Sequence, residues 1–212
     1  MAAKTPKSAG RPLSFDREKA LDRAMRVFWK KGFEGASLND LTAAMRIRPP
    51  SLYAAFGNKQ ALFEESLQRY LAGPVAYMSE ALGEPTAYQV TARILRQTAK
   101  LLTCGGSRCG CMTIQAAQVG GEESAAIRRR LIILRRTAQD ILRRRFERAK
   151  SEGDLPKTAD AADLARFVTT IFQGMTVQAI NGATRSELLR LGEMALQIWP
   201  KLEPVAENVS EP

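Results

Sequence analysis

The residues most able to do chemistry stand in one short stretch, MRIRPPSLYAAFGNK at positions 45–59. Arg46 and Arg48 offer guanidinium donors that suit the paired acceptors of guanine. Tyr53 and Lys59 could donate to phosphate oxygens. Lys59 opens the next expected helix, where the helix dipole disfavours a cation unless an anion binds there as well. A solvated lysine is the alternative, but beside Tyr53 a phosphate contact is favoured, so the stretch indicates nucleic-acid binding.

Two short helices must position these side chains. The first is expected over residues 38–45, because Ser37 opens a Ser-x-x-Asp capping pattern. The second is expected over residues 50–56, with Pro50 as its first residue, because a first-turn N–H has no intrahelical partner to lose. Pro49 should still be extended. Two helices joined by so short a turn indicate a helix-turn-helix, whose second helix can enter a major groove.

Composition agrees with this interpretation and excludes most enzyme classes. The 212 residues carry 32 Lys and Arg against 22 Asp and Glu, a formal charge of +10, which favours polyanions. The chain contains no histidine, so a Ser-His-Asp or Cys-His catalytic site cannot exist. Without a nucleotide-binding glycine motif either, we expect no enzyme activity, no cofactor and no metal. The N-terminus resembles no signal peptide and no stretch could cross a bilayer, so a cytoplasmic protein without membrane contact is expected.

Three clustered cysteines, Cys104, Cys109 and Cys111, allow three interpretations. Three thiols without histidine leave a tetrahedral zinc site one ligand short. A redox or electrophile sensor is the second interpretation, since Arg108 could lower the pKa of a neighbouring thiol. Small apolar packing residues are the third and favoured one. The odd number and close spacing suit reduced thiols better than a disulfide framework.

An all-α fold is expected, because no segment alternates like a strand and apolar residues recur at helical spacing. Ten Lys and Arg within residues 128–150 could form a second nucleic-acid patch, although a solvated outer face is favoured. Besides the two short helices, we expect helices over about 15–31 with Ser14 as its cap, 58–82, 86–103, 112–119, 122–152, 160–180 and 185–199.

The last two expected helices, 160–180 and 185–199, are apolar on more than one side. Such helices must be buried, which in a domain of this size indicates a subunit interface, with a buried pair inside one subunit as the alternative. Gly174 and Gly192 are costly inside helices, so close helix approach is expected there. The expected interface residues are Phe167, Ile171, Gly174, Met175, Leu188, Leu191, Ala195 and Trp199.

A ligand pocket is harder to locate from the sequence. Methionine and aromatic residues at helical spacing could line one, although such residues more often form plain core. No cluster of charged residues defines the ligand's chemistry. The candidates are Met78, Tyr88, Met112, Gln115, Phe172 and Met175.

Residues Leu13 to Tyr70 resemble the DNA-binding domain of TetR/AcrR-type transcriptional regulators. The resemblance rests on ALDRAMRVFWKKGFEGASLNDLTAAM and PSLYAAFGNKQALF. One position departs from the family pattern: Arg46 stands where a turn glycine is usual, so the turn must either be left-handed or change shape. The residues that carry the pattern are Phe28, Gly32, Phe33, Ser37, Leu52, Tyr53, Phe56 and Lys59.

The resemblance implies a basic arm over residues 1–12, a helix-turn-helix domain over 13–58, and a helical effector-binding and dimerisation domain over 59–203. It implies that Arg11 of the arm touches the DNA backbone. It also implies phosphate contacts for Ser37, Tyr53 and Lys59, and base contacts for Pro50, Ser51 and Ala54.

The expected function is a homodimeric transcriptional regulator, most simply a repressor, that binds a palindromic operator in double-stranded DNA and is released by an unknown small-molecule effector. Two recognition helices would enter successive major grooves, about 34–36 Å apart. Two alternatives remain at this point. One is a thiol-switched regulator of the same fold, and the other is a helical carrier of hydrophobic ligands without a role in transcription.

Overall fold

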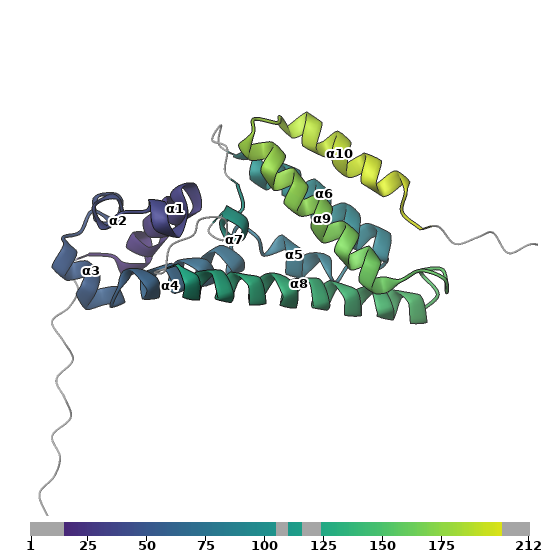
Figure 1. The fold of residues 1–212 in the computed structure, drawn as a ribbon, viewed down its shortest axis with the longest axis horizontal. Helices are drawn as coiled ribbons and strands as arrows, with labels where there is room; N and C mark the ends of the chain where they lie inside the picture. Colours follow the sequence, from purple (N-terminus) through teal and green to yellow (C-terminus); the bar gives the residue numbers. More distant parts are fainter. Residues whose placement is uncertain (1–14, 105–109, 116–123, 201–212) are drawn as a thin grey trace, which may run out of the picture.

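A computed structural model describes residues 15–104, 110–115 and 124–200, and these form ten helices and no strand (Figure 1). The expected all-α fold is thereby confirmed. Within the described ranges, no helix is both long and apolar enough to span a membrane. The helices are α1 Arg17–Gly35, α2 Leu38–Met45, α3 Pro49–Phe56, α4 Lys59–Ala72, α5 Tyr77–Ala81, α6 Ala87–Leu102, α7 Met112–Gln115, α8 Ala125–Ser151, α9 Ala161–Ile180 and α10 Arg185–Gln197.

Polar side chains fix most of the helix starts. Ser37 and Thr184 each form a reciprocal capping box, and the one at Ser37 confirms the predicted cap. Thr86 forms a third one at the start of α6. Helix α1 is capped by Asp16, whose carboxylate accepts the backbone N–H of Lys19 at 3.1 Å. The predicted cap Ser14 lies outside the described residues.

The N-terminal helices enclose an aromatic core. Phe28 of α1 meets Phe63 of α4 edge to face, with ring centroids 5.1 Å apart, and Phe33 meets Phe63 at 5.3 Å. Gly32 has φ of 71°, a conformation that side chains disfavour, and it bends the chain between these two phenylalanines. This bend follows the expected end of the first helix at residue 31 and brings Phe33 back onto the core.

Ion pairs tie the same helices together at the surface. Arg17 of α1 donates to the Glu65 carboxylate of α4 at 2.7 Å and lies 4.4 Å above the ring of Phe56 in α3. Arg69 of α4 pairs with Glu18 and Asp22 of α1. Single exposed pairs contribute little, but these bridges join α1 to α4, two helices far apart in sequence. Arg17 also donates to the Ala55 carbonyl oxygen of α3 at 3.3 Å, which holds α3 against α1.

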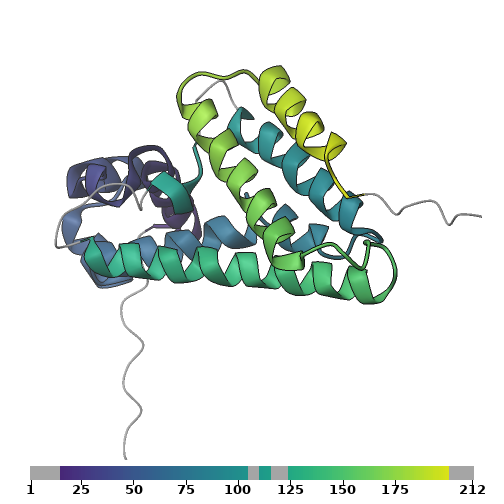
Figure 2. The same cartoon turned by 45° about the vertical axis from the view of Figure 1, so that its right-hand side comes forward.

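The remaining helices build a second body in which α6, α9 and α10 lie side by side and the long α8 runs across them (Figure 2). Phe146 of α8 packs on Trp199 near the end of α10, with ring centroids 5.4 Å apart. Buried Arg145 donates to the carbonyl oxygens of Leu82, Glu84 and Pro85 and so holds the turn before α6.

The two bodies share one continuous core. Leu67 and Tyr70 of α4 belong to the same buried cluster as Cys111 just before α7, Leu131 of α8 and Phe172 of α9. The predicted division at residues 58 and 59 stays a prediction, because α4 packs both on α1 and on this shared core.

Several predicted boundaries were wrong. The helix expected over 58–82 breaks at Gly73 and Pro74, because proline lacks the N–H that a continuous helix requires there. Pro49, not Pro50, is the first residue of α3, since both of the first two positions tolerate proline and Arg48 supplies the extended residue before it. The helix expected over 112–119 includes 112–115, and the rest of it lies outside the described residues.

Candidate nucleic-acid interface and ligand cavity

The turn between α2 and α3 is left-handed at Arg46. This residue has φ of 58° and ψ of 44°, and its N–H donates to the carbonyl oxygens of Thr42 and Ala43. Among the described residues, it is the only one other than glycine with a positive φ. The chain therefore keeps the conformation that glycine would adopt, at a cost, and presents an exposed guanidinium group at the turn.

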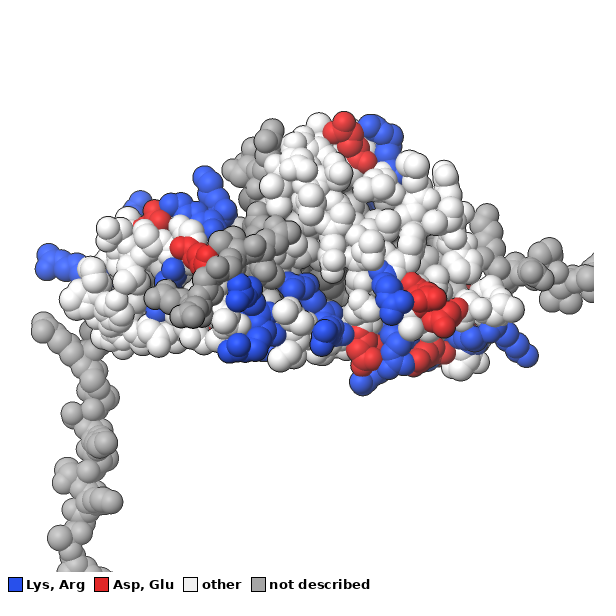
Figure 3. All heavy atoms as spheres, in the orientation of Figure 1, with Lys and Arg blue, Asp and Glu red and all other residues white. Residues whose placement is uncertain are grey.

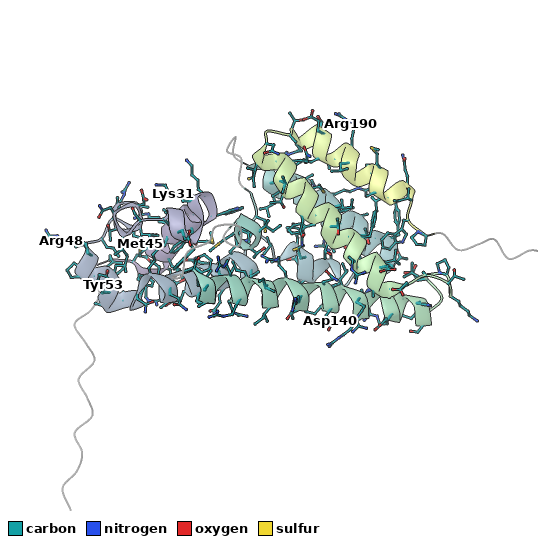
Figure 4. The ribbon with its side chains drawn as sticks, viewed as in Figure 1. Lys31, Met45, Arg48, Tyr53, Asp140 and Arg190 are labelled. Atoms are coloured by element: carbon teal, nitrogen blue, oxygen red, sulfur yellow. The ribbon has the colours of Figure 1, made fainter. Side chains whose placement is uncertain are left out.

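The recognition helix α3 starts immediately after Arg48. Arg48 has extended backbone angles and makes no side-chain cap, and its side chain projects from one end of the molecule (Figure 4). Pro49 and Pro50 remove two N–H groups, and the next one, of Ser51, donates to the Arg48 carbonyl oxygen at 3.0 Å. The start of α3 therefore has few backbone donors for phosphate, and most of the hydrogen-bond donors there belong to the Arg48 side chain.

The rest of α3 is divided between a buried side and a solvent-exposed side. Leu52 and Phe56 are buried beneath it, and Ile47 of the turn packs against the same core. Tyr53 is 48% exposed, and Ala54 lies beside it on the open side of the helix. The small residues Pro50, Ser51 and Ala54, which were predicted to face bases, leave the outer surface of α3 narrow enough to approach a groove.

Lys59 is the first residue of α4, and its ammonium group lies 4.6 Å from the centre of the Phe33 ring. The contact is a cation–π interaction, which holds the cation close to the start of α4. Asn58 caps the N–H of Ala61 at 2.8 Å, so the cap occupies only the third N–H of the helix. A lysine held beside a helix start has the arrangement that a phosphate requires.

Ser37 has a structural role at the start of α2. Its hydroxyl accepts the N–H of Asp40 and donates to the Asp40 carboxylate, so it already serves the helix cap. Lys31 donates to the same carboxylate at 2.6 Å, and this bond, together with those from Ser37, lowers the pKa of Asp40 to about 2. A phosphate contact by Ser37 stays a prediction, as does that by Arg11, which lies outside the described residues.

A cavity of about 390 Å³ lies between α4, α5, α6, α7, α8 and α9, within the size range of small-molecule sites. Two of the predicted ligand contacts, Met78 and Phe172, line it. Met112 is fully buried in the adjoining core. The side chain of Gln115 lies outside the described part of the chain.

The other two predicted contacts do not line this cavity. Tyr88 is exposed on the first turn of α6, and Met175 is fully buried in a separate cluster with residues of α6 and α10. Helical spacing shows only that such residues share a face, and the partner of that face depends on packing. The predicted contacts do not include Tyr70, Cys111, Thr113 and Arg135, which line the cavity together with the polar residues Ser79, Thr169 and Gln173.

The predicted dimer residues fall into two groups. Phe167, Ile171, Gly174 and Leu191 are accessible to different degrees on the outer sides of α9 and α10. The other group, which is buried inside the protomer, consists of Met175, Leu188, Ala195 and Trp199. Three further apolar residues are exposed, namely Val177 on α9, Met194 on α10 and Ile198 at the C-cap of α10, and the last two are 63% and 71% exposed.

The surface over α9 and α10 is poor in charge in the view of Figure 3, whereas Lys and Arg gather on the N-terminal helices and along α8. Gly174 has no atom within 4 Å of the place where a Cβ would stand. Gly192 differs, because a Cβ there would lie 3.4 Å from Leu95 of α6. Gly192 thus faces α6 inside the protomer, whereas the position of Gly174 is open to another molecule.

Two of the three cysteines are described: Cys104 is exposed and Cys111 is buried. Cys111 receives a hydrogen bond from the Tyr70 hydroxyl at 3.6 Å and lies 3.0 Å from the Thr113 hydroxyl. Cys109 lies outside the described residues. Within the described ranges, no group of three or more metal-binding side chains is present.

A helix-turn-helix on a larger helical domain defines a class of DNA-binding regulators, and comparison with known proteins agrees. The profile of "Bacterial regulatory proteins, tetR family" matches residues 20–66. The repressor ComR of Escherichia coli K12 is 34% identical over 202 residues, which are 92% of this chain and 94% of ComR. The repressor BdcR of the same strain is 27% identical, over 88% of this chain and 90% of BdcR.

A solved structure is more similar still. The TetR family regulator CifR, as a cysteine mutant in complex with a 26-base-pair operator duplex, is 44% identical with a TM-score of 0.85. The match covers 90% of this chain and all of that one. The chain belongs to the TetR family, whose members are helix-turn-helix transcriptional regulators that act as homodimers on double-stranded DNA.

Proposed function

We propose that the protein is a cytoplasmic repressor that binds a palindromic operator as a homodimer and releases it when a small molecule occupies the cavity. One observation carries the proposal: an exposed recognition helix and a ligand-sized cavity share a single buried core through α4. Similarity to two repressors over nearly their whole length supports repression rather than activation of transcription.

Base recognition is assigned mainly to Arg48, with Arg46 second and Ser51 beside them. The outer surface of α3 otherwise offers proline, alanine and one tyrosine, which have few hydrogen-bonding groups. An arginine at the start of a recognition helix can reach the two acceptors of guanine. Tyr53 and Lys59 are assigned to phosphate, as the position of Lys59 beside a helix start supports.

Dimerisation is assigned to the outer sides of α9 and α10. Ile171 and Gly174 on α9, with Leu191, Met194 and Ile198 on α10, recur at spacings of three, four and seven residues and so form continuous stripes. The poverty of charge on this surface and the open space at Gly174 support a partner helix there. Such a pairing would set the distance between the two recognition helices.

Communication between cavity and DNA is assigned to three side chains. Tyr70 lines the cavity and packs edge to face on Trp29 of α1, with ring centroids 4.9 Å apart. The indole N–H of Trp29 donates to the carbonyl oxygen of Gly110, next to Cys111. A ligand that displaces Cys111 or Tyr70 would thus move α1 relative to the C-terminal body, provided that it binds the two arrangements unequally.

The experiment is binding to a library of duplexes drawn from DNA upstream of the gene, at several salt concentrations. Lys59→Ala should weaken binding to all sequences alike and lower the salt slope by about 1 for each phosphate that the lysine no longer neutralises. Arg48→Ala should cost roughly 1–3 kcal/mol at specific sites and relax the preference at one position of each half-site. Arg190 lies on α10, far from the end of the molecule that carries Arg48 (Figure 4). Arg190→Ala therefore serves as the control for loss of an arginine, and it should change neither the salt slope nor the base preference.

The reverse pattern, in which Lys59→Ala alters base preference and Arg48→Ala does not, would exchange the two roles. Unchanged binding by both variants would contradict the assignment of α3 to DNA. A thiol-switched repressor is the second candidate, because Cys111 lines the cavity. Replacement of Cys104, Cys109 and Cys111 by serine should leave effector release intact if the cavity ligand alone controls the protein.

A further inference from the structure

The wall of the cavity is mostly apolar, and its polar side chains include Thr113 and Arg135 as well as Ser79, Thr169 and Gln173. Thr113 and Arg135 are joined, since the Arg135 guanidinium donates to the Thr113 carbonyl oxygen at 2.5 Å. Cys111 and Tyr70 adjoin Thr113 through the sulfur contacts described above. Leu142 lies seven residues beyond Arg135 on α8, roughly 10 Å further along at 1.5 Å per residue, among aliphatic side chains.

Charge on this wall is of one sign only. Among the described lining residues, Arg135 is the one with a charged side chain, and none is aspartate or glutamate. Other arginines of α8 do have acidic neighbours: Arg130 lies 3.6 Å from Glu64, and Arg143 lies 2.7 Å from Asp140. Within the described chain, no ion pair of 4 Å or less involves Arg135.

The position of Arg135 is unfavourable in the empty cavity. Its side chain is half-buried, and burial lowers the pKa of its guanidinium, an effect that the nearby Cys111 opposes. A partly desolvated charge without a counter-charge destabilises the folded state. A negative group in the cavity would offset that cost, and it would do so only in the arrangement that keeps Arg135 turned inward.

We propose that the effector is an amphipathic organic anion, a carboxylate or similar acid on an apolar body. Its acid group pairs with Arg135, and its apolar body fills the space lined by Leu82, Leu142 and Val168. The inference rests on the proposed effector control and specifies the ligand's chemistry. An acid at Arg135 lies beside Thr113 and Cys111, next to the contact of Tyr70 with Trp29, where a ligand has most influence on α1.

The test compares acids with neutral molecules of the same shape. Binding of 4-phenylbutyrate and 4-phenylbutan-1-ol, and of octanoate and octan-1-ol, is measured by calorimetry on the full chain without DNA. Each acid should bind at least about tenfold more tightly than its alcohol, because a charge-assisted hydrogen bond is stronger than a neutral one. Alcohols that bind as tightly as the acids, or no binding by either pair at millimolar concentration, would overturn the proposal.

Three variants locate the site. Arg135→Gln should remove the preference for acids while leaving the alcohols bound as before, and Arg135→Lys should retain part of it. Arg136→Gln removes the next, exposed arginine of α8 and should leave the preference unchanged. An acid preference that survives Arg135→Gln, or that disappears in Arg136→Gln, contradicts the assignment.

Operator binding by the ligand-free proteins is measured in parallel and separates the two proposals. Normal operator affinity without a preference for acids would refute the ligand class alone. Failure of the native protein to bind any upstream duplex would refute the regulatory function, whatever the cavity binds. If Arg135→Gln does not fold, the comparison of acids with alcohols in the native protein still decides the question.

Discussion

The N-terminal helices and the C-terminal bundle differ in how completely each buries and packs its own apolar side chains. In the first region, aromatic rings fill the core around Phe28, and Arg17 and Arg69 tie α1 to α4. In the second, a cavity of about 390 Å³ stays inside and apolar residues such as Met194 stay outside. A region that reads DNA gains from rigidity, whereas a region that responds to a ligand must keep room for it.

The largest expected effect contrasts a buried methionine of α9 with an exposed methionine of α10. Met175→Asp places a carboxylate in a fully buried cluster and should destabilise the protomer by at least about 3–5 kcal/mol, a large part of a typical domain's stability. Met194→Asp changes an exposed residue of α10 and should leave a folded protomer that no longer dimerises. Circular dichroism and sedimentation measure the two properties separately, and a Met194→Asp variant that stays dimeric would contradict the interface.

A second contrast compares the filled core with the one that holds a cavity. Phe28→Ala should cost about 3–5 kcal/mol of unfolding free energy, because rings on both sides leave no room for the core to collapse. Phe172→Ala enlarges a cavity that already exists, so the neighbouring side chains give up less packing and a cost of roughly 1–3 kcal/mol is expected. Urea denaturation of both variants measures the difference, and equal costs would show that the two cores are packed alike.

The same difference explains what the sequence could predict. Local chemistry decides caps and turns, so the cap at Ser37 and the starts of the helices expected from residues 58 and 185 were predicted close to their observed positions. The left-handed turn at Arg46 was one of two predicted outcomes. Residues on an apolar helix face were recognised as buried or paired, but spacing does not show which neighbour covers them.

The polar wall of the cavity depends on contacts between distant segments. Arg135 belongs to a run of arginines on α8, and only its bond to Thr113, 22 residues earlier, distinguishes it from exposed neighbours such as Arg136. Met175 and Met194 also could not be distinguished from the sequence, because both lie on helices that are apolar on more than one side, yet Met175 is buried and Met194 is exposed. The sequence therefore predicted the class of protein and the DNA-facing end better than the cavity.

A third prediction concerns the turn of the DNA-reading region. Arg46→Gly should raise the free energy of unfolding by about 1 kcal/mol, because glycine adopts a φ of 58° without the cost that a side chain incurs. The same change removes a cation from the turn and should weaken operator binding with a smaller salt dependence. Arg46→Asn, which tolerates this conformation, should lose DNA affinity to the same extent. A glycine variant that is less stable than the native protein would contradict the inference that the left-handed conformation of Arg46 is strained.

The smallest expected effect is the acid sensitivity of the cap at α2. Bonds from Lys31 and Ser37 lower the pKa of Asp40 from 3.8 to about 2. Because this pKa is lower in the folded state, the carboxylate stabilises folding above pH 4, and this contribution is lost as the pH falls towards 2. Asp40→Asn should therefore lower the melting temperature slightly at pH 6, and its difference from the native protein should shrink between pH 4 and 2. Asp16→Asn, at the cap of α1, should behave in the same way, since its pKa is lowered by the Lys19 backbone N–H. A difference for Asp40→Asn that is constant over this range would show that the neutral acid caps α2 as well as the carboxylate does.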